Sequence, residues 1–94
     1  MDEAVIIRSD NKFYIGESEQ MAEAEITWVP TGEDQIIVDH TWVDNSLRGQ
    51  GIARQLLERV VAMAREEQLT IIPTCSYARV KLEGDPQYAD VLRR

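Results

Sequence analysis

The sequence predicts an α/β fold of the α+β kind: a mixed, mainly antiparallel sheet with one long helix and short C-terminal helices. Three observations predict it. Residues 21–29 alternate between apolar and polar side chains, apolar side chains recur at helical spacing over residues 52–64, and the predicted order is strands, helix, strand, helix. A chain of 94 residues is the usual size of one domain, so we expect a single domain over residues 1–94.

Several strands are expected before the long helix. In the third, apolar side chains up to Trp28 share one face, which is typical of a half-buried antiparallel strand. The fourth contains the run Ile36–Val38, which indicates burial on both faces. The predicted strands are residues 5–8, 13–15, 21–29 and 35–43, with a turn at 30–34.

The second half of the chain begins with the long helix, expected over residues 51–67. A strand at 70–74 should follow, and we expect its pairing to weaken or split at Pro73, which has no N–H group. Ser76 is a suitable N-cap for a short helix that ends at Gly84. A last helical turn is expected over residues 87–92.

Composition and charge exclude some classes of partner. The net charge of −7 argues against nucleic acid or an anionic membrane as the main partner. No apolar run is long enough to predict a membrane span. Cys75 is the single cysteine, so no intramolecular disulfide can form, and a reducing, cytoplasmic location fits best.

The run from Leu47 to Ala53 joins the fourth strand to the long helix. Its glycines allow a tight turn, and the helix behind it directs free N–H groups and a positive dipole end forward. A phosphate is the expected occupant, and Arg48 is placed to pair with it. A plain tight turn explains the local string equally well. The spacing fits neither a P-loop nor a dinucleotide fingerprint.

Read as Arg48-Gly49-Gln50-Gly51-Ile52-Ala53, this run resembles the Q/R-x-x-G-x-G/A motif of the GNAT acetyltransferase superfamily. Three more stretches, residues 40–43, 73–77 and 85–88, resemble its smallest, single-domain YjdJ-like members. The resemblance implies acetyl-coenzyme A as co-substrate, an amine acceptor of unknown identity and no metal. The cofactor-binding residues that we expect are Trp42, Val43, Arg48, Gly49, Gln50, Gly51, Ile52, Ala53 and Ser76.

The sequence departs from the family pattern at two positions. Trp42 stands where an acidic residue is expected, so a general base cannot be carried over to that position. Gln87 replaces the more usual glutamate before Tyr88, with no evident consequence.

Cys75 and His40 are the candidate catalytic residues. A thiol at a helix N-terminus is favoured as thiolate, which is a competent acyl acceptor, and the resemblance places this cysteine near the thioester. The alternative is a small buried apolar residue. His40 is the only histidine, and it would act as a base for Cys75 or for an amine if the two strands lie side by side. A structural histidine is the competing interpretation.

Two functions therefore stand side by side. The first is an acetyl-coenzyme A-dependent acyltransferase, with transfer directly to an amine or through an acetylated Cys75. The second is a non-catalytic coenzyme A-binding or protein-interaction module, which the lack of a certain base favours. The short N-terminal strands allow a monomer or a weak homodimer.

Overall fold

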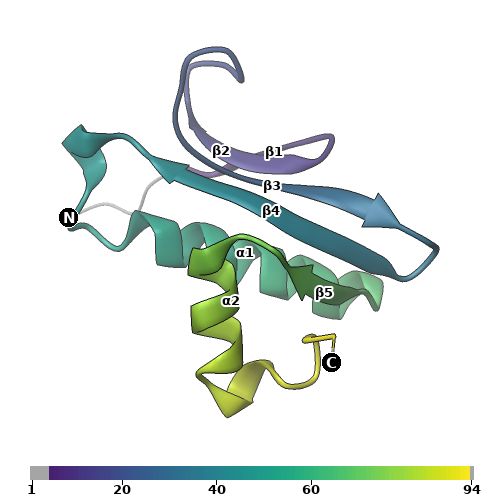
Figure 1. Ribbon diagram of the computed structural model, residues 1–94. Helices are drawn as coiled ribbons and strands as arrows, with labels where there is room; N and C mark the ends of the chain where they lie inside the picture. Colours follow the sequence, from purple (N-terminus) through teal and green to yellow (C-terminus); the bar gives the residue numbers. More distant parts are fainter. Residues whose placement is uncertain (1–4, 94) are drawn as a thin grey trace.

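The structure is a computed structural model that describes residues 5–93. It has one five-stranded sheet in the order β1-β2-β3-β4-β5, with helix α1 packed across one face and α2 next to β5 (Figure 1). The elements are β1 (Ile7–Ser9), β2 (Lys12–Gly16), β3 (Ala22–Thr31), β4 (Gln35–Val43), the 3₁₀ turn η1 (Asn45–Leu47), α1 (Ile52–Glu67), β5 (Thr70–Pro73), α2 (Ser76–Glu83) and η2 (Pro86–Tyr88).

The sheet is mixed and mainly antiparallel, as predicted. Strands β1 to β4 pair antiparallel in succession. Helix α1 then carries the chain back along the sheet, so that β5 pairs parallel to β4. Among the described residues, no helix is long and apolar enough to cross a membrane.

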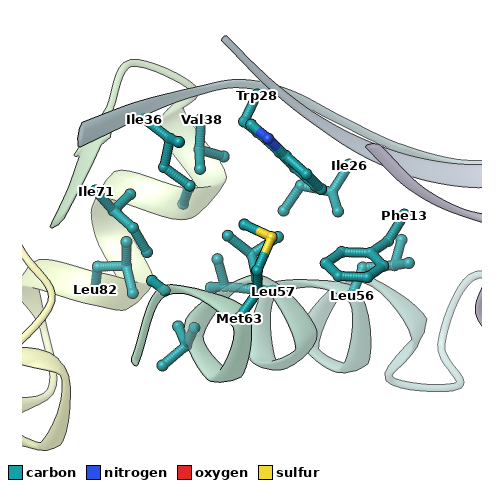
Figure 2. Close-up of a cluster of buried hydrophobic side chains, with 14 of the residues drawn as sticks. Phe13, Ile26, Trp28, Ile36, Val38, Leu56, Leu57, Met63, Ile71 and Leu82 are labelled. Atoms are coloured by element: carbon teal, nitrogen blue, oxygen red, sulfur yellow. The ribbon is translucent and has the colours of Figure 1, made fainter. Parts of the chain in front are cut away.

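The core lies between the sheet and α1. Figure 2 shows Leu56, Leu57 and Met63 of the helix beneath Trp28 and other inward side chains of the sheet. The predicted apolar stripe of α1 is therefore confirmed, and so is the core position of Trp28, which is 4% exposed. Helix α2 adds two buried side chains, Ala78 and Leu82, to the same core.

Several predicted boundaries are wrong by a few residues. The first strand covers Ile7–Ser9, not residues 5–8, and the predicted turn at 30–34 is shorter because β3 continues to Thr31. After Gly84 the chain forms the short η2 and further turns, rather than a helix over residues 87–92. Helix α2 begins at Ser76 with Cys75 as its N-cap residue, so Ser76 is not the cap.

A bulge in β4 decides which side chains face the helices. Thr27 pairs with His40 but the next residue, Trp28, pairs with Val38, so Asp39 is an extra residue in β4. An extra residue reverses the inward and outward alternation of a strand. Val38 and Ile36 point into the core before the bulge, and Thr41 and Val43 take the inward side after it.

Candidate functional site

Strands β4 and β5 separate halfway along β4. They pair from Gln35 opposite Thr70 to Val38 opposite Pro73. The Val38 carbonyl then accepts hydrogen bonds from the backbone N–H of Thr74 at 3.0 Å and of Cys75 at 3.2 Å. The chain turns from there into α2, and residues 39–43 of β4 continue without β5 beside them.

The predicted split at Pro73 is confirmed in position, but its expected cause is wrong. N–H groups along a strand point alternately to either side. Thr74 donates to β4, whereas Ile71 donates to the carbonyl of Val91 on the opposite edge of β5, at 2.6 Å. The nitrogen of Pro73 therefore faces away from β4, and the missing N–H removes no bond between these two strands. The turn that brings two N–H groups to Val38 accounts for the separation instead.

The separated half of β4 turns backbone groups of Thr41 and Val43 toward the gap, and of these the Val43 carbonyl is bonded to Arg48. Asp44 donates its N–H to the carbonyl of Glu23 in the β3 segment at 2.8 Å. By the antiparallel alternation, the N–H and C=O groups of Val43 and Thr41 point the other way, toward the gap left by β5. The Arg48 guanidinium crosses this edge, where its Nε donates to the Val43 carbonyl at 3.2 Å.

The conformation of the loop between β4 and α1 is set by hydrogen bonds of Asp44 and by two glycines with positive φ angles. Asp44 accepts hydrogen bonds from the hydroxyl and backbone N–H of Ser46, which hold the pKa of its carboxyl below the usual range. Gly49 and Gly51 have φ angles of 84° and 74°. A Cβ atom at either position would meet no heavy atom within 4 Å. These glycines are needed for their backbone conformation and not for lack of space.

Helix α1 begins without a side-chain cap, because Gly51 occupies the N-cap position. Within residues 5–93, the N–H groups of Ile52, Ala53 and Arg54 find no acceptor. Three free donors and the positive end of a helix of 16 residues therefore point into the loop. This arrangement suits an anion.

The loop, the separated half of β4 and α2 enclose a cleft of about 500 Å³. Three of its lining side chains are basic, although the net charge of the chain is −7. The residues that line it are Thr41, Val43, Leu47, Arg48, Gly49, Gly51, Ile52, Ala53, Arg54, Tyr77 and Lys81.

Cys75 contacts the wall of this cleft through Thr41. The Sγ atom of Cys75 lies 3.4 Å from Oγ1 of Thr41, across the separation between the strands. The cysteine is half-buried and is the N-cap residue of α2. Tyr77, two residues further along the chain and in the cleft wall, has its pKa raised because burial disfavours the charged phenolate. Like any tyrosine hydroxyl at neutral pH, its hydroxyl is protonated and can donate a hydrogen bond.

His40 and Trp42 lie on the other face of the sheet. His40 Nε2 is 3.4 Å from Oε2 of Glu25, whose Oε1 also pairs with Lys12 at 3.2 Å. Trp42 is opposite Glu25 in the register and is 38% exposed. The structure does not bring His40 to Cys75, because the neighbouring residue, Thr41, is the one that contacts the cysteine. It also leaves Trp42 outside the cleft lining.

Comparison with known proteins decides the family. Residues 12–91 match the family model for the GCN5-related N-acetyl-transferase. The chain belongs to the GCN5-related N-acetyltransferase family. Members of this family transfer an acetyl group, with acetyl-coenzyme A as co-substrate, to an acceptor. The predicted family and acyl transfer activity are therefore confirmed. No curated protein matches the chain significantly.

Solved structures agree with this assignment. The solution structure of a GCN5-like N-acetyltransferase candidate from Staphylococcus aureus is 44% identical, with a TM-score of 0.82 over 99% of this chain and 91% of that one. A GNAT-family acetyltransferase from S. aureus Mu50 is 18% identical, with a TM-score of 0.54 over 64% of this chain and 39% of that one. Nourseothricin acetyltransferase is 19% identical, with a TM-score of 0.51 over 64% and 36%. The last two show the fold alone.

The cleft of this acetyltransferase contains most of the residues expected at the cofactor. Val43, Arg48, Gly49, Gly51, Ile52 and Ala53 line it. Gln50 turns its side chain back to the Ser46 carbonyl at 3.4 Å, and Ser76 is exposed at the start of α2. The lining also includes residues that the sequence did not assign to the cofactor: Thr41, Arg54, Tyr77, Lys81, and Leu47 at the start of the glycine run. Their spacing carries no signal, because they come from four separate elements, β4, η1, α1 and α2.

Proposed function

We propose that this acetyltransferase binds acetyl-coenzyme A in the 500 Å³ cleft, with the pyrophosphate on residues 48–53 and the thioester near Cys75. The observation that carries the proposal is the 3.4 Å contact between Cys75 Sγ and Thr41, a residue of the cleft wall. This contact supports the proposal because the Cys75 thiol, the group that we propose as nucleophile, then lies beside a cleft whose other end is suited to an anion.

The residues at the loop end fit a pyrophosphate. The free N–H groups of Ile52, Ala53 and Arg54 supply donors, and the conformations of Gly49 and Gly51 keep the backbone exposed to the ligand. Arg48 stays at the edge of the same loop, where its guanidinium can pair with phosphate oxygens through the N–H groups that do not contact Val43.

The edge of β4 fits the pantetheine arm. Thr41 offers its backbone N–H and C=O groups toward the gap left by β5, and Val43 offers its N–H, while the Val43 carbonyl accepts from Arg48. An extended, amide-containing ligand can pair there as an additional strand would. The Val43 N–H is then available to a thioester oxygen and stabilises the negative charge that develops on it during acyl transfer.

In the covalent route, the Cys75 thiolate attacks the thioester carbonyl carbon. A bond forms between that carbon and Sγ, and the bond to the coenzyme sulfur breaks, which releases coenzyme A as its thiolate. The acceptor amine then attacks the acetyl carbon on Cys75, the bond to Sγ breaks, and the amine proton passes to solvent or to the released thiolate. Tyr77, which lines the cleft, supplies a hydrogen bond from its hydroxyl to the departing sulfur.

Mass spectrometry of the protein after incubation with acetyl-coenzyme A, without acceptor, tests this route. One acetyl group is expected on Cys75 of the wild type and none in Cys75→Ala. Thioester turnover with an amine panel should fall by about 10³-fold in that variant, as for loss of a covalent nucleophile. The side chain of Cys75 makes no helix-capping hydrogen bond, so the variant should fold.

A matched control is Arg79→Gln, an exposed position on α2 that lines no part of the cleft. It should retain acetylation and turnover. An unacetylated Cys75 together with full turnover in Cys75→Ala would rule out the covalent route and leave direct transfer. Tight binding with no thioester loss across the panel would favour a module that binds without catalysis.

A further inference from the structure

The sheet has an outer face, on the side away from the helices, and the separated half of β4 forms part of it. Helices α1 and α2 both pack into the core on the inner side, so no helix of residues 5–93 covers the outer face (Figure 1). Residues 39–43 also lack the neighbour that β5 provides to the first half of the strand. His40 and Trp42 project outward from this segment, and both are exposed.

This arrangement determines the side from which an acceptor can approach. The cleft lies on the inner side of the gap, where Thr41 and Val43 line it. A coenzyme bound in the cleft would occupy that inner side. An acceptor would then reach the thioester, or an acetylated Cys75, from the outer face.

The two faces of β4 carry opposite charge at this point. Three basic side chains line the cleft on the inner side. The outer face of β2 to β4 instead carries three carboxylates, and Lys12 contributes one positive charge there. The carboxylates are those of Glu23, Glu25 and Asp39. An anionic coenzyme on the inner side and a cationic acceptor on the outer side match this separation of charge.

Glu23 is the carboxylate of the outer face that is available to a ligand. Both oxygens of Glu25 are engaged, by Lys12 at 3.2 Å and by His40 at 3.4 Å. Asp39 accepts a hydrogen bond from a threonine hydroxyl of β3 at 2.7 Å. Glu23 is exposed, and no ion pair within residues 5–93 involves it.

Trp42 lies between Glu23 and the gap. Its strand borders the gap, and Glu23 lies diagonally across from it on β3, because the pair next to them is Ala24 opposite Val43. Two strand spacings, roughly 10 Å, therefore separate the carboxylate from the gap. The indole ring is 38% exposed and offers an apolar surface that also attracts cations.

We propose that the acceptor lies across Trp42 on the outer face and is a dication: an alkylamine whose reacting end enters the gap and whose second cationic group pairs with Glu23. This inference rests on the proposed function, because it needs the acetyl group to be at the gap. It names the class of acceptor, and it holds for direct transfer and for transfer through Cys75.

Three amines of equal chain length test the assignment: hexamethylenediamine, hexylamine and 6-aminohexanoate. The value of kcat/KM for the diamine should exceed that for hexylamine by about ten-fold. A factor of about two comes from its two reactive ends, and about five-fold comes from one exposed ion pair. The aminohexanoate, which brings a carboxylate to Glu23, should be the poorest acceptor. These differences should shrink as salt is raised, because exposed charges are screened.

Two variants separate the parts of the acceptor site. Glu23→Gln should lower kcat/KM for the diamine to about twice that for hexylamine, and hexylamine itself should be unaffected. Glu33→Gln, an exposed position in the turn at the other end of β3, is the matched control and should change neither value. Trp42→Ala should lower kcat/KM for all three amines several-fold, with no change in the affinity for coenzyme A measured by calorimetry.

The outcomes distinguish this inference from the proposed function. A diamine no better than hexylamine per reactive end, or an unchanged preference in Glu23→Gln, would overturn the inference alone. Weaker coenzyme A binding in Trp42→Ala would assign this side chain to the coenzyme and overturn it too. If coenzyme A binds but none of the three amines is acetylated, the inference fails. If coenzyme A does not bind, the proposed function fails as well.

Discussion

The two halves of strand β4 have different partners and different tasks. Residues 35–38 pair with β3 on one side and β5 on the other, and Ile36 and Val38 are buried against α1. Residues 39–43 keep β3 but lose β5, and their inward side chains line the cleft. One continuous strand thus supports the core with its first half and opens the site with its second.

The second half of β4 can bind a ligand because its backbone N–H and C=O groups have no strand beside them on the β5 side. A buried strand must have its N–H and C=O groups satisfied within the sheet. At the gap, the groups of Thr41 and Val43 have no strand beside them, so a ligand can take the place of the missing strand. Core and site can therefore be disturbed separately, by substitutions on either side of the bulge.

Loss of apolar volume in the core half should have the largest effect. Ile36→Ala is expected to lower the free energy of unfolding by about 3 kcal/mol, because Ile36 is buried and a cavity would remain. Urea denaturation measures this change. The matched control is Ile37→Ala, the next residue on the opposite, half-buried side, which should cost clearly less. An equal cost for both variants would contradict the assignment of the buried face.

Alanine substitutions of the glycines at the two ends of β4 should distinguish an effect on protein stability from an effect on coenzyme A binding. Gly32, before the strand, and Gly51, after it, have φ angles of 72° and 74°, and a Cβ atom at either meets nothing within 4 Å. Alanine at each position should cost about 1 kcal/mol in stability, since the left-handed conformation disfavours a side chain. Thermal denaturation should show similar losses for the two variants.

Only Gly51→Ala should also weaken coenzyme A, by about ten-fold, because only Gly51 orients the N–H groups at the start of α1. Calorimetry compares the two variants directly. If Gly32→Ala and Gly51→Ala bind coenzyme A with the same affinity, the glycine run does not contact the ligand and is a simple turn.

The contact across the gap should have the smallest effect of the three. Thr41→Val removes the hydroxyl beside Cys75 Sγ but keeps the shape of the side chain. Alkylation of Cys75 by iodoacetamide at neutral pH should slow by a few-fold, as expected for the loss of about 1 kcal/mol of hydrogen bonding to the thiolate. The single cysteine makes this rate unambiguous.

Thr41→Ser restores a hydroxyl and should restore the rate of alkylation. If valine and serine behave alike at this position, the 3.4 Å contact has no influence on the reactivity of the thiol. The global stability of both variants should be close to that of the wild type, because Thr41 is only half-buried.

The sequence predicted the elements well where periodicity is strong. The helix was expected over residues 51–67 and covers Ile52–Glu67, and the fourth strand was expected over 35–43 and covers those residues. The ends of the chain were predicted less well. The start of β1 and the turn after Gly84 depend on which neighbours the backbone meets, and short segments there have little periodicity of their own.

The sequence predicted only part of the site, and the bulge in β4 explains why His40 and Trp42 were assigned to the cleft wrongly. Alternation continued from Ile36 and Val38 would place His40 and Trp42 on the inner face, beside the cofactor. The bulge at Asp39 reverses that order and puts Thr41 and Val43 there instead. Neither Asp39 nor its neighbours carry a clear bulge signal, such as glycine, so the reversal could not be read from the strand.

By itself, the sequence determined the order of the elements, the apolar stripe that packs α1 on the sheet, and the glycine run that resembles a motif of the family. These features are local, because they depend on side-chain periodicity and on the conformations that individual residues allow. Only the tertiary structure decided which face of β4 meets the cleft, and it alone brought Thr41 to Cys75 and Arg54 to Lys81. Those arrangements depend on pairing and packing between segments that are distant in the chain.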